Sequence, residues 1–303
     1  MPTRPRYLQL DVFSMHPGGG NPLGVVIDAH GWSDVDMQGF AAWTNLVETT
    51  FVLQPTSPDA SYRLRIFTPQ REIPFAGHPT IGSAHAILET GFAQIRDGGL
   101  IQECDAGLLP IRVEGEGSAR QLFVQAPVSR VVREGVESEP LLKSLLAGIA
   151  LGALPPAFIE GGRRWWVAEF ADEADLRSWR PDHDTIARLA QTTDCLGLCV
   201  FARRAAGNAD ATGTGDDYDL VVRAFPAGVG IVEDPASGAA NGLIAAWIAL
   251  REPQGPLAHG YRVSQGREIG RDASIVIRID SAGAVWVGGR THTIVSGTAA
   301  WGQ

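Results

Sequence analysis

Two short segments of this chain, far apart in the sequence, follow the same pattern. Residues 77–84 read Gly-His-Pro-Thr-Ile-Gly-Ser-Ala, and residues 233–240 read Glu-Asp-Pro-Ala-Ser-Gly-Ala-Ala. In each, a polar residue precedes a proline, a glycine follows three positions after the proline, and small residues come next. Upstream of each lies an Arg-x-Phe triplet, at residues 65–67 and 223–225, where a strand is expected to end. The pattern predicts a duplicated unit of strand, loop and helix.

Both motif segments predict helix starts. Proline favours the first helical position, because its fixed φ suits the helix and its missing N–H is not needed there. We therefore expect helices over residues 79–90 and 235–250, with His78 and Asp234 as their N-caps. Both helices are apolar or small almost all round, so each must be surrounded by other structure. A central helix wrapped by a strongly curved sheet, once per domain, fits this pattern, and two facing helix N-termini could hold an anion.

Composition excludes several classes of partner. The 303 residues carry a net charge of −9, from 25 Lys and Arg against 34 Asp and Glu. Nucleic acids and anionic membrane surfaces attract basic proteins, so we expect neither as a partner. The first residues lack a secretory signal, and the most apolar segment, residues 243–250, is too short to span a bilayer. These features predict a soluble cytoplasmic protein.

The remaining elements follow from capping signals and periodicity. Ser33 and Asp36 can form a capping box that opens a helix ending near Thr44. Amphipathic patterns predict two peripheral helices, over residues 140–151 and 185–192. The cysteines lack a metal-binding spacing, and two of them are expected in one buried β segment; the three are Cys104, Cys195 and Cys199.

Glu48 is the strongest candidate for chemistry. It lies within Asn-Leu-Val-Glu-Thr-Thr-Phe-Val-Leu at residues 45–53, between a helix end and an apolar strand. A carboxylate among apolar neighbours tends to have a raised pKa, which suits a general base. From this segment alone, a glutamate at the exposed edge of a strand stays open as an alternative. His78 and Asp234 can likewise be plain helix-cap residues, although capping does not exclude a catalytic role.

The sequence Gly-Gly-Gly-Asn-Pro at residues 18–22 is like a phosphate-binding loop only superficially. No Lys-Ser/Thr pair follows it, and a strand takes the place of the helix that such a loop needs. We interpret it as a turn whose glycines let the backbone approach a ligand or the other domain.

Several blocks of this sequence form a recognisable set. The most specific surrounds His78, at residues 74–82. The others are residues 11–13 with 20–22, 45–52, 65–69, 233–238, 264–266, 270–271 and 287–289. Together they span essentially the whole chain and resemble the phenazine-biosynthesis isomerase (PhzF-like) family.

The resemblance implies an α+β fold of the diaminopimelate-epimerase-like kind. It has two similar lobes, each a β-barrel-like curved sheet around a central buried helix, with the active site in the cleft between them. We expect residues 1–126 and about 290–303 in the N-terminal lobe and residues 127–289 in the C-terminal lobe. The change of composition at residues 126–139 predicts the linker, and the Gly/Asn/Asp-rich residues 205–217 predict a mobile loop.

By the same resemblance, Glu48 matches the family's catalytic acid/base, and His78 and Asp234 match the polar residues at the two helix starts. In the phenazine enzyme the glutamate moves a proton along a cyclohexadiene carboxylate, so that an enol becomes a ketone, without a metal or organic cofactor. We expect a small carboxylate substrate to bind at Gly20, Asn21, Gly77, Ser237, Gly238 and Ala239. The family often has serine at the position of Ala239, so this chain lacks a hydroxyl there.

Two other functions stay open. A two-base racemase or epimerase of the same fold uses a cysteine at each helix start, whereas this chain has His78 and Asp234 there. A non-catalytic module that binds a small molecule or a protein is the second alternative, and Ala239 favours it. Exchange of solvent deuterium into candidate carboxylates discriminates among these functions. A homodimer is the default expectation for an enzyme of this size.

Overall fold

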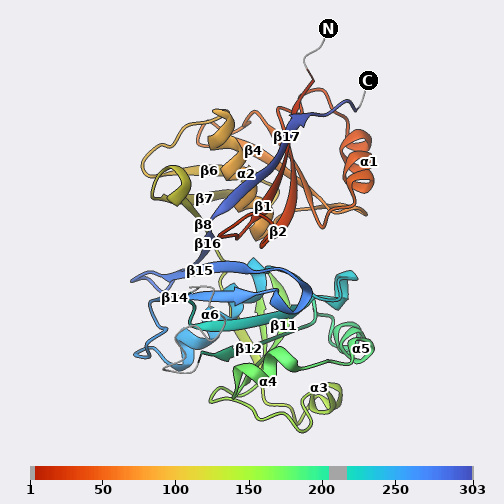
Figure 1. Cartoon of the computed structure of the whole chain (residues 1–303), viewed down its shortest axis with the longest axis vertical. Coiled ribbons are helices and arrows are strands. Elements are labelled where there is room, and N and C mark those ends of the chain that lie inside the picture. Colours follow the sequence, from red (N-terminus) through yellow and green to blue (C-terminus); the bar gives the residue numbers. More distant parts are fainter. Residues whose placement is uncertain (1–3, 205–216, 302–303) are drawn as a thin grey trace. The chain divides into compact units, whose positions relative to one another are not determined.

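The computed structural model describes residues 4–204 and 217–301, so the loop expected at residues 205–217 lies almost entirely outside the described residues. The chain divides into two compact units (Figure 1). Unit 1 comprises Met1–Gln125 and Gly288–Gln303, and unit 2 comprises Ala126–Val287. Each unit is a mixed α/β structure with many strands and few helices.

Unit 1 consists of one sheet with two helices, α1 (Asp34–Thr44) and α2 (Gly77–Thr90), and a 3-10 turn, η1 (Gly117–Ala119). Its strands are β1 (Arg6–Val12), β2 (Asn21–Ile27), β3 (Thr49–Leu53), β4 (Tyr62–Phe67), β5 (Glu72–Ile73), β6 (Gly99–Cys104), β7 (Gly107–Glu114), β8 (Gln121–Gln125) and β17 (Thr291–Thr298). They pair in the order β17, β1, β2, β3, β4, β6, β7, β8, and β5 adds to β4. Two pairs, β2–β3 and β4–β6, are parallel, because a helix connects the strands of each pair.

Unit 2 repeats this topology. Its strands are β9 (Arg130–Glu134), β10 (Ala157–Gly161), β11 (Arg163–Phe170), β12 (Leu198–Arg203), β13 (Leu220–Phe225), β14 (Gly260–Gln265) and β15 (Ala273–Ile279), and β16 (Val285–Gly289) runs across the boundary between the units. Its helices are α3 (Pro140–Leu145), α4 (Glu173–Ser178), α5 (His183–Thr193) and α6 (Gly238–Arg251), with 3-10 turns η2 (Ala227–Val229) and η3 (Arg267–Ile269). The parallel pairs are β11–β12 and β13–β14, and α6 connects the second pair as α2 connects β4 and β6.

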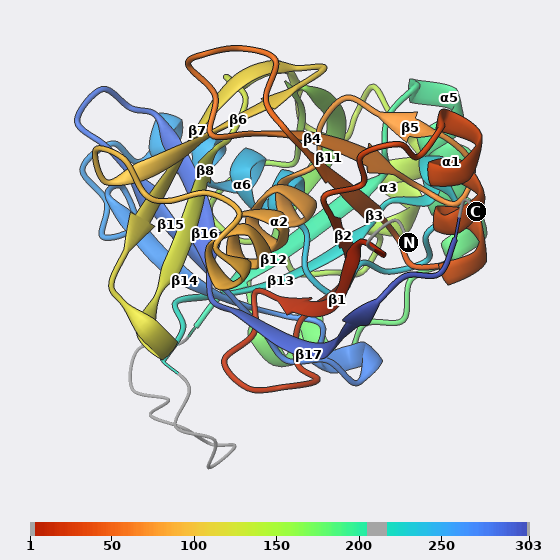
Figure 2. The same cartoon turned by 90° about the horizontal axis from the view of Figure 1, so that it is seen from above.

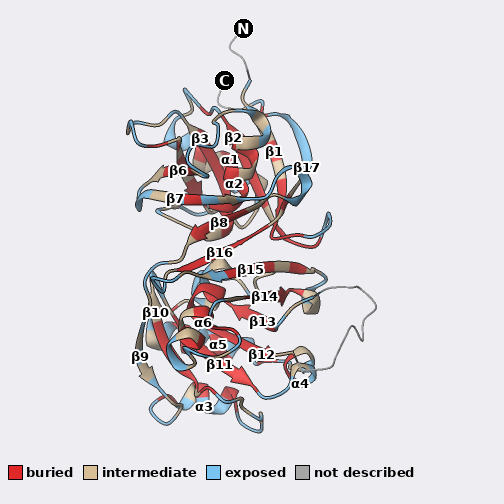
Figure 3. Ribbon diagram, turned by 90° about the vertical axis from the view of Figure 1, so that its left-hand side faces the viewer, coloured by how far each residue is buried: buried red, intermediate tan, exposed pale blue. Residues whose placement is uncertain are grey.

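The helices α2 and α6 are the most buried helices among the described residues, as their composition predicts. Nine of the 14 residues of α2 and eight of the 14 of α6 are buried, against three of 11 in α1. Strands β1, β2, β3, β4, β8 and β17 pack against α2 (Figure 2), and β10, β11 and β15 pack against α6. Colouring by burial shows the same contrast between these two helices and the peripheral ones (Figure 3). The two helices therefore form the centres of the two cores.

The start of α2 differs from the prediction. The helix begins at Gly77, so His78 lies inside it and Pro79 is its third residue. Its N-cap is Ala76, which has no side chain that can accept a hydrogen bond. Proline is tolerated throughout the first turn, because none of those N–H groups has a partner within the helix. Pro79 therefore did not mark the first helical position.

The start of α6 also differs. This helix begins at Gly238, so both Asp234 and Pro235 precede it. The N-cap is Ser237, whose Oγ accepts a hydrogen bond from the Ala240 N–H at 3.3 Å. Asp234 was the wrong choice of cap because the serine lies closer to the first helical residue and is an equally good capping side chain.

Among the peripheral elements, α1 has the capping box expected from Ser33 and Asp36. Helix α5 agrees with the predicted range within two residues at each end. Helix α3 ends at Leu145, well before residue 151, because the chain turns away at Gly148, which has a φ of +78°. The stretch expected as a linker, residues 126–139, contains β9, which pairs with β10, so part of it belongs to the sheet of unit 2.

Both cysteines of the predicted β segment are buried, but only Cys199 lies in a strand, β12, and Cys195 precedes it. No helix within residues 4–204 and 217–301 has the length and apolar character needed to cross a membrane.

Candidate active site

Glu48 and His78 lie side by side in unit 1. Helix α1 ends at Thr44, and its C-cap Asn45 has a φ of +53°, which turns the chain towards β3. Glu48 stands just before that strand. The Oε2 atom of Glu48 lies 3.5 Å from the Nε2 atom of His78, and the two side chains are 12% and 7% exposed, respectively. Glu48 is therefore not an exposed strand-edge residue. A carboxyl group and an imidazole meet at a largely buried point beside the start of α2.

His78 is held in its neutral form. Burial lowers its pKa from the usual 6.5 to about 3, because the cationic ring would lose its hydration. A hydrogen bond to the backbone of Pro22 acts in the opposite direction. Proline offers only a carbonyl oxygen, so the imidazole must be the donor. Since Nε2 has no hydrogen bond among the described residues, Nδ1 donates to Pro22 and the lone pair of Nε2 faces Glu48.

Gly20 and Asn21 lead directly into Pro22, and both are buried. A Cβ atom at Gly20 would collide with the backbone carbonyl of Val12, so glycine is required for the start of β2 to lie against β1. At Gly20, this glycine-rich turn thus brings its backbone close to β1, a strand of the same unit. The turn positions the Pro22 carbonyl and through it the ring of His78.

The start of α2 lacks a side-chain cap, because its N-cap residue is Ala76. The Thr80 N–H bonds to the Ala76 carbonyl at 3.2 Å, and Pro79 has no N–H. The uncapped amides of the first turn are therefore those of Gly77 and His78. Such amides, together with the positive end of the helix dipole, can bind an anion.

The start of α6 is capped, but incompletely. The Oγ of Ser237 satisfies the Ala240 N–H, which leaves the amides of Gly238 and Ala239 without a side-chain cap. Ala239 is exposed and Gly238 is half-buried. This helix start can also bind an anion, and it carries no titratable side chain in its first turn.

Asp234 stabilises the turn that leads into α6 rather than the helix itself. Its Oδ1 accepts a hydrogen bond from the Ala236 N–H at 3.2 Å, its own N–H donates to the Ala224 carbonyl at 2.9 Å, and its carbonyl accepts from the Gln265 Nε2 at 2.8 Å. Side chains of aspartate often bond to the backbone two residues on in this way. Asp234 is thus fixed by its backbone on both sides.

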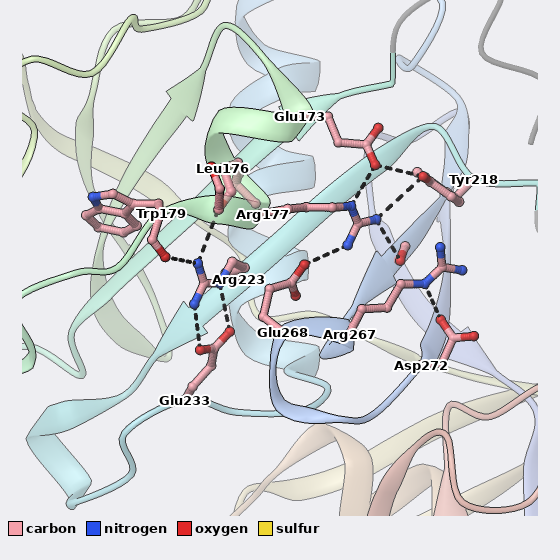
Figure 4. A network of polar contacts seen from close by, with 12 residues as sticks. Glu173, Leu176, Arg177, Trp179, Tyr218, Arg223, Glu233, Arg267, Glu268 and Asp272 are labelled. Carbon is pink, nitrogen blue, oxygen red and sulfur yellow. Dashed lines mark hydrogen bonds and ion pairs between the residues drawn. The ribbon is translucent and has the colours of Figure 1, made fainter. Parts of the chain in front are cut away.

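An ion pair of the same geometry lies upstream of each buried helix. Arg65 binds Glu72 through Nε and Nη2 at 2.7 and 2.6 Å, and Arg223 binds Glu233 through the same atoms at 2.9 Å each (Figure 4). Each guanidinium group lies 5.1 Å from the centre of the phenylalanine ring two positions further along the chain. Each glutamate stands five residues before its helix.

These pairs define the register of the duplication. Counted from the glutamates, residues 72–77 read Glu-Ile-Pro-Phe-Ala-Gly and residues 233–238 read Glu-Asp-Pro-Ala-Ser-Gly. Backbone pairing agrees, because Ile73 and Asp234 each pair with the central residue of the preceding Arg-x-Phe triplet. The two segments are therefore structurally equivalent.

The sequence alignment that paired Pro79 with Pro235 was wrong by five residues, since Pro74 is the counterpart of Pro235. The shared Pro-x-x-Gly pattern placed a helical proline opposite one in a loop. In the correct register His78 corresponds to Ala239. The two helix starts consequently do not carry equivalent polar side chains.

The structure brings together two groups of expected site residues. Glu48, His78, Gly77, Gly20 and Asn21 gather near the start of α2 in unit 1. Asp234, Ser237, Gly238 and Ala239 gather near the start of α6 in unit 2. Within the described residues no group of three or more His, Cys, Asp and Glu side chains could hold a metal ion.

Sequence reasoning missed the buried amide side chains beside both helix starts. In unit 1, Gln102 donates to the Thr80 hydroxyl at 3.1 Å and accepts from the Tyr62 hydroxyl at 3.0 Å. In unit 2, the Asn241 Nδ2 donates to the Gln265 Oε1 at 2.9 Å. Thr80 and Asn241 are each the fourth residue of their helix. A polar residue at the same position of two otherwise apolar helices was the signal that could have revealed them.

Comparison with known proteins finds relatives that match nearly the whole chain. A family model described as "Phenazine biosynthesis-like protein" matches residues 10–301. A Schizosaccharomyces pombe protein named Antisense-enhancing sequence 1 is 33% identical over 304 residues, which cover 97% of this chain and 98% of the relative. The trans-2,3-dihydro-3-hydroxyanthranilate isomerase of Pseudomonas aeruginosa is 33% identical over 299 residues, which cover 97% of this chain and 99% of the relative.

Solved structures share the fold. A PhzF-family phenazine biosynthesis protein from Bacillus anthracis matches with a TM-score of 0.81 at 23% identity, covering 98% of this chain and 99% of its own. A probable proline racemase from Agrobacterium radiobacter matches with a TM-score of 0.63 at 13% identity, covering 98% and 93%. These likenesses establish a mixed α/β fold common to both groups of proteins. With the family model and the two relatives, they lead to one conclusion: this chain belongs to the phenazine biosynthesis-like (PhzF) family.

Proposed function

We propose that this protein is a cofactor-independent isomerase that moves a proton on a small carboxylate, with Glu48 as the general acid and base. The observation that carries the proposal is the buried contact between Glu48 and His78, 3.5 Å apart beside an uncapped helix start. The Pseudomonas aeruginosa relative is named for the isomerisation of a ring amino-carboxylate, which gives the substrate class.

The tautomer of His78 explains how the pair can hold a proton. Its Nδ1–H is engaged by the Pro22 carbonyl, so Nε2 can only accept. An ionised carboxylate beside that lone pair would be repelled, whereas a protonated Glu48 can donate to it. The same glutamate, once deprotonated, can take a proton from carbon.

The isomerisation itself needs only one mobile proton. Glu48 removes a carbon-bound proton, the electron pair of that C–H bond shifts the adjacent double bond, and a proton returns from Glu48 to a different carbon. No electrons leave the substrate and no group is transferred. A positioned acid/base of this kind typically contributes about 10² to 10⁴ in rate.

The uncapped amides at the helix starts supply the complementary role of holding a carboxylate. We assign this role in unit 2 to the amides of Gly238 and Ala239, with Asp234 and Ser237 shaping the turn around them. The proposal includes the finer fold description, in which each unit is a curved sheet wrapped around its buried helix in the diaminopimelate-epimerase-like manner.

A thiol-dependent racemase is less well supported. The N-cap positions carry Ala76 and Ser237, neither of which is a thiol. Burial raises the pKa of the Cys195 and Cys199 thiols, and the thiolate is the reactive form. Replacing the three cysteines should therefore affect stability more than turnover.

The test is proton exchange with a defined substrate. The protein is incubated with trans-2,3-dihydro-3-hydroxyanthranilate in D₂O, and the product and its deuterium content are followed by NMR. Glu48→Gln keeps the shape of the side chain but cannot accept a proton, so turnover should fall by about 10² to 10⁴, or roughly 2.7–5.5 kcal/mol of barrier.

A matched control lies in the same unit. Glu89 also pairs with a histidine, His85, at 3.0 Å, but near the far end of α2. Glu89→Gln should leave turnover within about twofold, since it removes the same charge away from the site. Full turnover in Glu48→Gln would overturn the proposal. Binding of ring carboxylates by the wild-type protein without any exchange would favour the non-catalytic binding module.

A further inference from the structure

Gln265 makes three hydrogen bonds to the turn that precedes α6 and to the start of that helix. This residue ends β14 and is fully buried. Its Nε2 donates to the Asp234 carbonyl at 2.8 Å, and its Oε1 accepts from the Ser237 N–H at 3.3 Å and from the Asn241 Nδ2 at 2.9 Å. A single amide group thus ties together the start of the turn, the N-cap and the first turn of the helix.

The orientation of this amide is determined by its partners. A backbone carbonyl can only accept and a backbone N–H can only donate, so the nitrogen must face Asp234 and the oxygen must face Ser237. Asn241 is fixed in the same way, because its Nδ2 donates to both Gln265 and the Ser237 carbonyl, at 2.9 and 2.8 Å. An ionised glutamate has the same length but offers no donor.

The backbone after Gln265 packs against the same turn. A Cβ atom at Gly266 would lie 2.7 Å from the Pro235 carbonyl oxygen, and the residue has a φ of +92°, so only glycine fits there without strain. The end of β14 and the turn at residues 234–237 are therefore in contact through both side chain and main chain.

The remaining anchors of the turn connect back to the same strand end (Figure 4). Arg223, which binds Glu233 at the start of the turn, also donates to the carbonyls of Leu176 and Trp179 at 3.1 and 2.7 Å. From the adjoining helix α4, Arg177 pairs with Glu268 at 2.7 Å, in the 3-10 turn that follows Gly266. The contacts form a closed path around the turn, which fixes it more firmly than any one contact could.

We propose that Gln265 is a positioning residue that sets the geometry of the carboxylate-binding start of α6. It acts through Ser237 and Asp234, which orient the free amides of Gly238 and Ala239. The inference rests on the proposed function, because it assigns to this helix start the carboxylate of the substrate. A helix start displaced by even a fraction of an ångström loses the directed hydrogen bonds that such a group requires.

Two substitutions separate positioning from simple stability. Gln265→Met keeps the volume but removes all three hydrogen bonds. KM for the ring carboxylate should rise about tenfold while kcat changes by less than about threefold, since Glu48 lies outside this turn. A purely structural role would lower the active fraction, and so the apparent kcat, at unchanged KM. The matched control is Gln38→Met on the peripheral helix α1, which removes the hydrogen bond from Gln38 Nε2 to the Thr68 carbonyl and should leave KM within about twofold.

Gln265→Glu gives a second, pH-dependent signature. The ionised carboxylate keeps the acceptor but loses the donor to Asp234 and adds a negative charge near the anion-binding amides. KM relative to wild type should therefore be higher than in Gln265→Met at neutral pH. It should return towards wild type as the pH is lowered, because the protonated acid regains a donor. A KM equal to that of wild type at every pH in both variants would overturn the proposal.

Hydrogen exchange tests the same idea without substrate. In Gln265→Met the amides of residues 234–241 should exchange at least about tenfold faster, while the second half of α6 and unit 1 keep their protection. Unchanged protection of this segment contradicts the positioning role. If the wild-type protein neither turns over the substrate nor binds anthranilate, the proposed function fails, and the exchange result still decides the role of Gln265.

Discussion

The starts of the two buried helices have the same backbone arrangement and equivalent ion pairs, but the ion pairs differ in burial and in their further partners. In unit 1 the Arg65 and Glu72 side chains are 16% and 29% exposed, and the third partner of Arg65 is Asp34, which is 82% exposed. In unit 2 the Arg223 and Glu233 side chains are 4% and 6% exposed, and the third partner is a pair of main-chain carbonyls. The ion pair of unit 2 is therefore buried, whereas that of unit 1 is partly exposed.

The titratable side chains, in contrast, are found at the less firmly anchored helix start, that of unit 1. Unit 1 has no N-cap side chain but presents His78, with Glu48 beside it. In unit 2, Ser237 caps the helix and Gln265 forms a hydrogen bond with the Ser237 N–H. The counterpart of His78 there is Ala239, which cannot titrate. A duplicated element can thus keep its backbone arrangement while its side chains take different roles. We interpret unit 1 as the half adapted to proton transfer and unit 2 as the half adapted to holding a charged group.

The sharpest way to break this comparison is to remove each arginine in turn. Arg223→Ala leaves a buried, uncompensated Glu233, so it should lower the free energy of unfolding by about 3–5 kcal/mol. Arg65→Ala removes a pair that water already reaches and should lower it by about 1 kcal/mol. Urea denaturation measures both. Equal losses of unfolding free energy in the two variants would mean that burial does not make the ion pair of unit 2 more important for stability.

The pH dependence of stability should arise in unit 1. The folded protein binds a proton at His78 only near pH 3, whereas the unfolded chain binds one near pH 6.5. Stability is therefore complete above about pH 6.5 and is lost as the pH falls towards 3. Between pH 7 and 4.5 this single residue should account for about 2–3 kcal/mol.

The control is His78→Gln, which has no such group and should lose correspondingly less stability on acidification. Urea midpoints at several pH values, measured for both proteins and for Glu48→Gln, isolate the contribution of the histidine from that of its neighbour. Parallel pH profiles for wild type and His78→Gln would contradict the neutral, buried state of this residue.

The N-caps should respond unequally to exchange of their side chains. Ser237→Ala removes a cap and should lower stability by about 1 kcal/mol. Ala76→Ser should raise it by only a few tenths of a kcal/mol, because Pro79, at the third helical position, has no N–H and the new hydroxyl can bind only the His78 amide. Thermal unfolding of the two variants checks this, and a gain of a full cap in Ala76→Ser would show that the start of α2 is not as described.

The smallest expected effect concerns selectivity at the start of α6. Ala239→Ser adds one donor at an exposed position of the first helical turn. One hydrogen bond is worth about 0.5–1.5 kcal/mol, so affinities across a panel of ring carboxylates should change by roughly two- to tenfold, and not uniformly. Identical binding by both proteins would show that this position does not face the ligand.

The sequence revealed the buried helices and the family for identifiable reasons. All-round small and apolar composition predicts a buried helix whatever its partners, and this was confirmed for α2 and α6. The capping box of α1 is a local signal and was also confirmed. The block around His78 was specific enough to indicate the family that the comparisons then established.

What the sequence did not reveal depends on contacts between distant segments. The register of the duplication follows from two equivalent ion pairs, Glu72 with Arg65 and Glu233 with Arg223, which no local pattern reports. The role of Gln265 depends on Asp234 and Ser237, about 30 residues away, and no periodicity reports such a contact. Local patterns therefore placed the elements, while tertiary hydrogen bonds decided how the helix starts are held.

The most direct test of the account is the protonation state of His78, because the proposed chemistry of unit 1 depends on its Nε2 lone pair facing Glu48. The measurement is ¹⁵N NMR of the histidine ring nitrogens in the unliganded protein between pH 4 and 8. We expect a neutral ring with the proton on Nδ1 throughout this range, and a change in the Nε2 signal in Glu48→Gln. A ring protonated on Nε2, or one that becomes cationic near pH 6.5, would contradict a neutral His78 whose Nε2 lone pair faces Glu48.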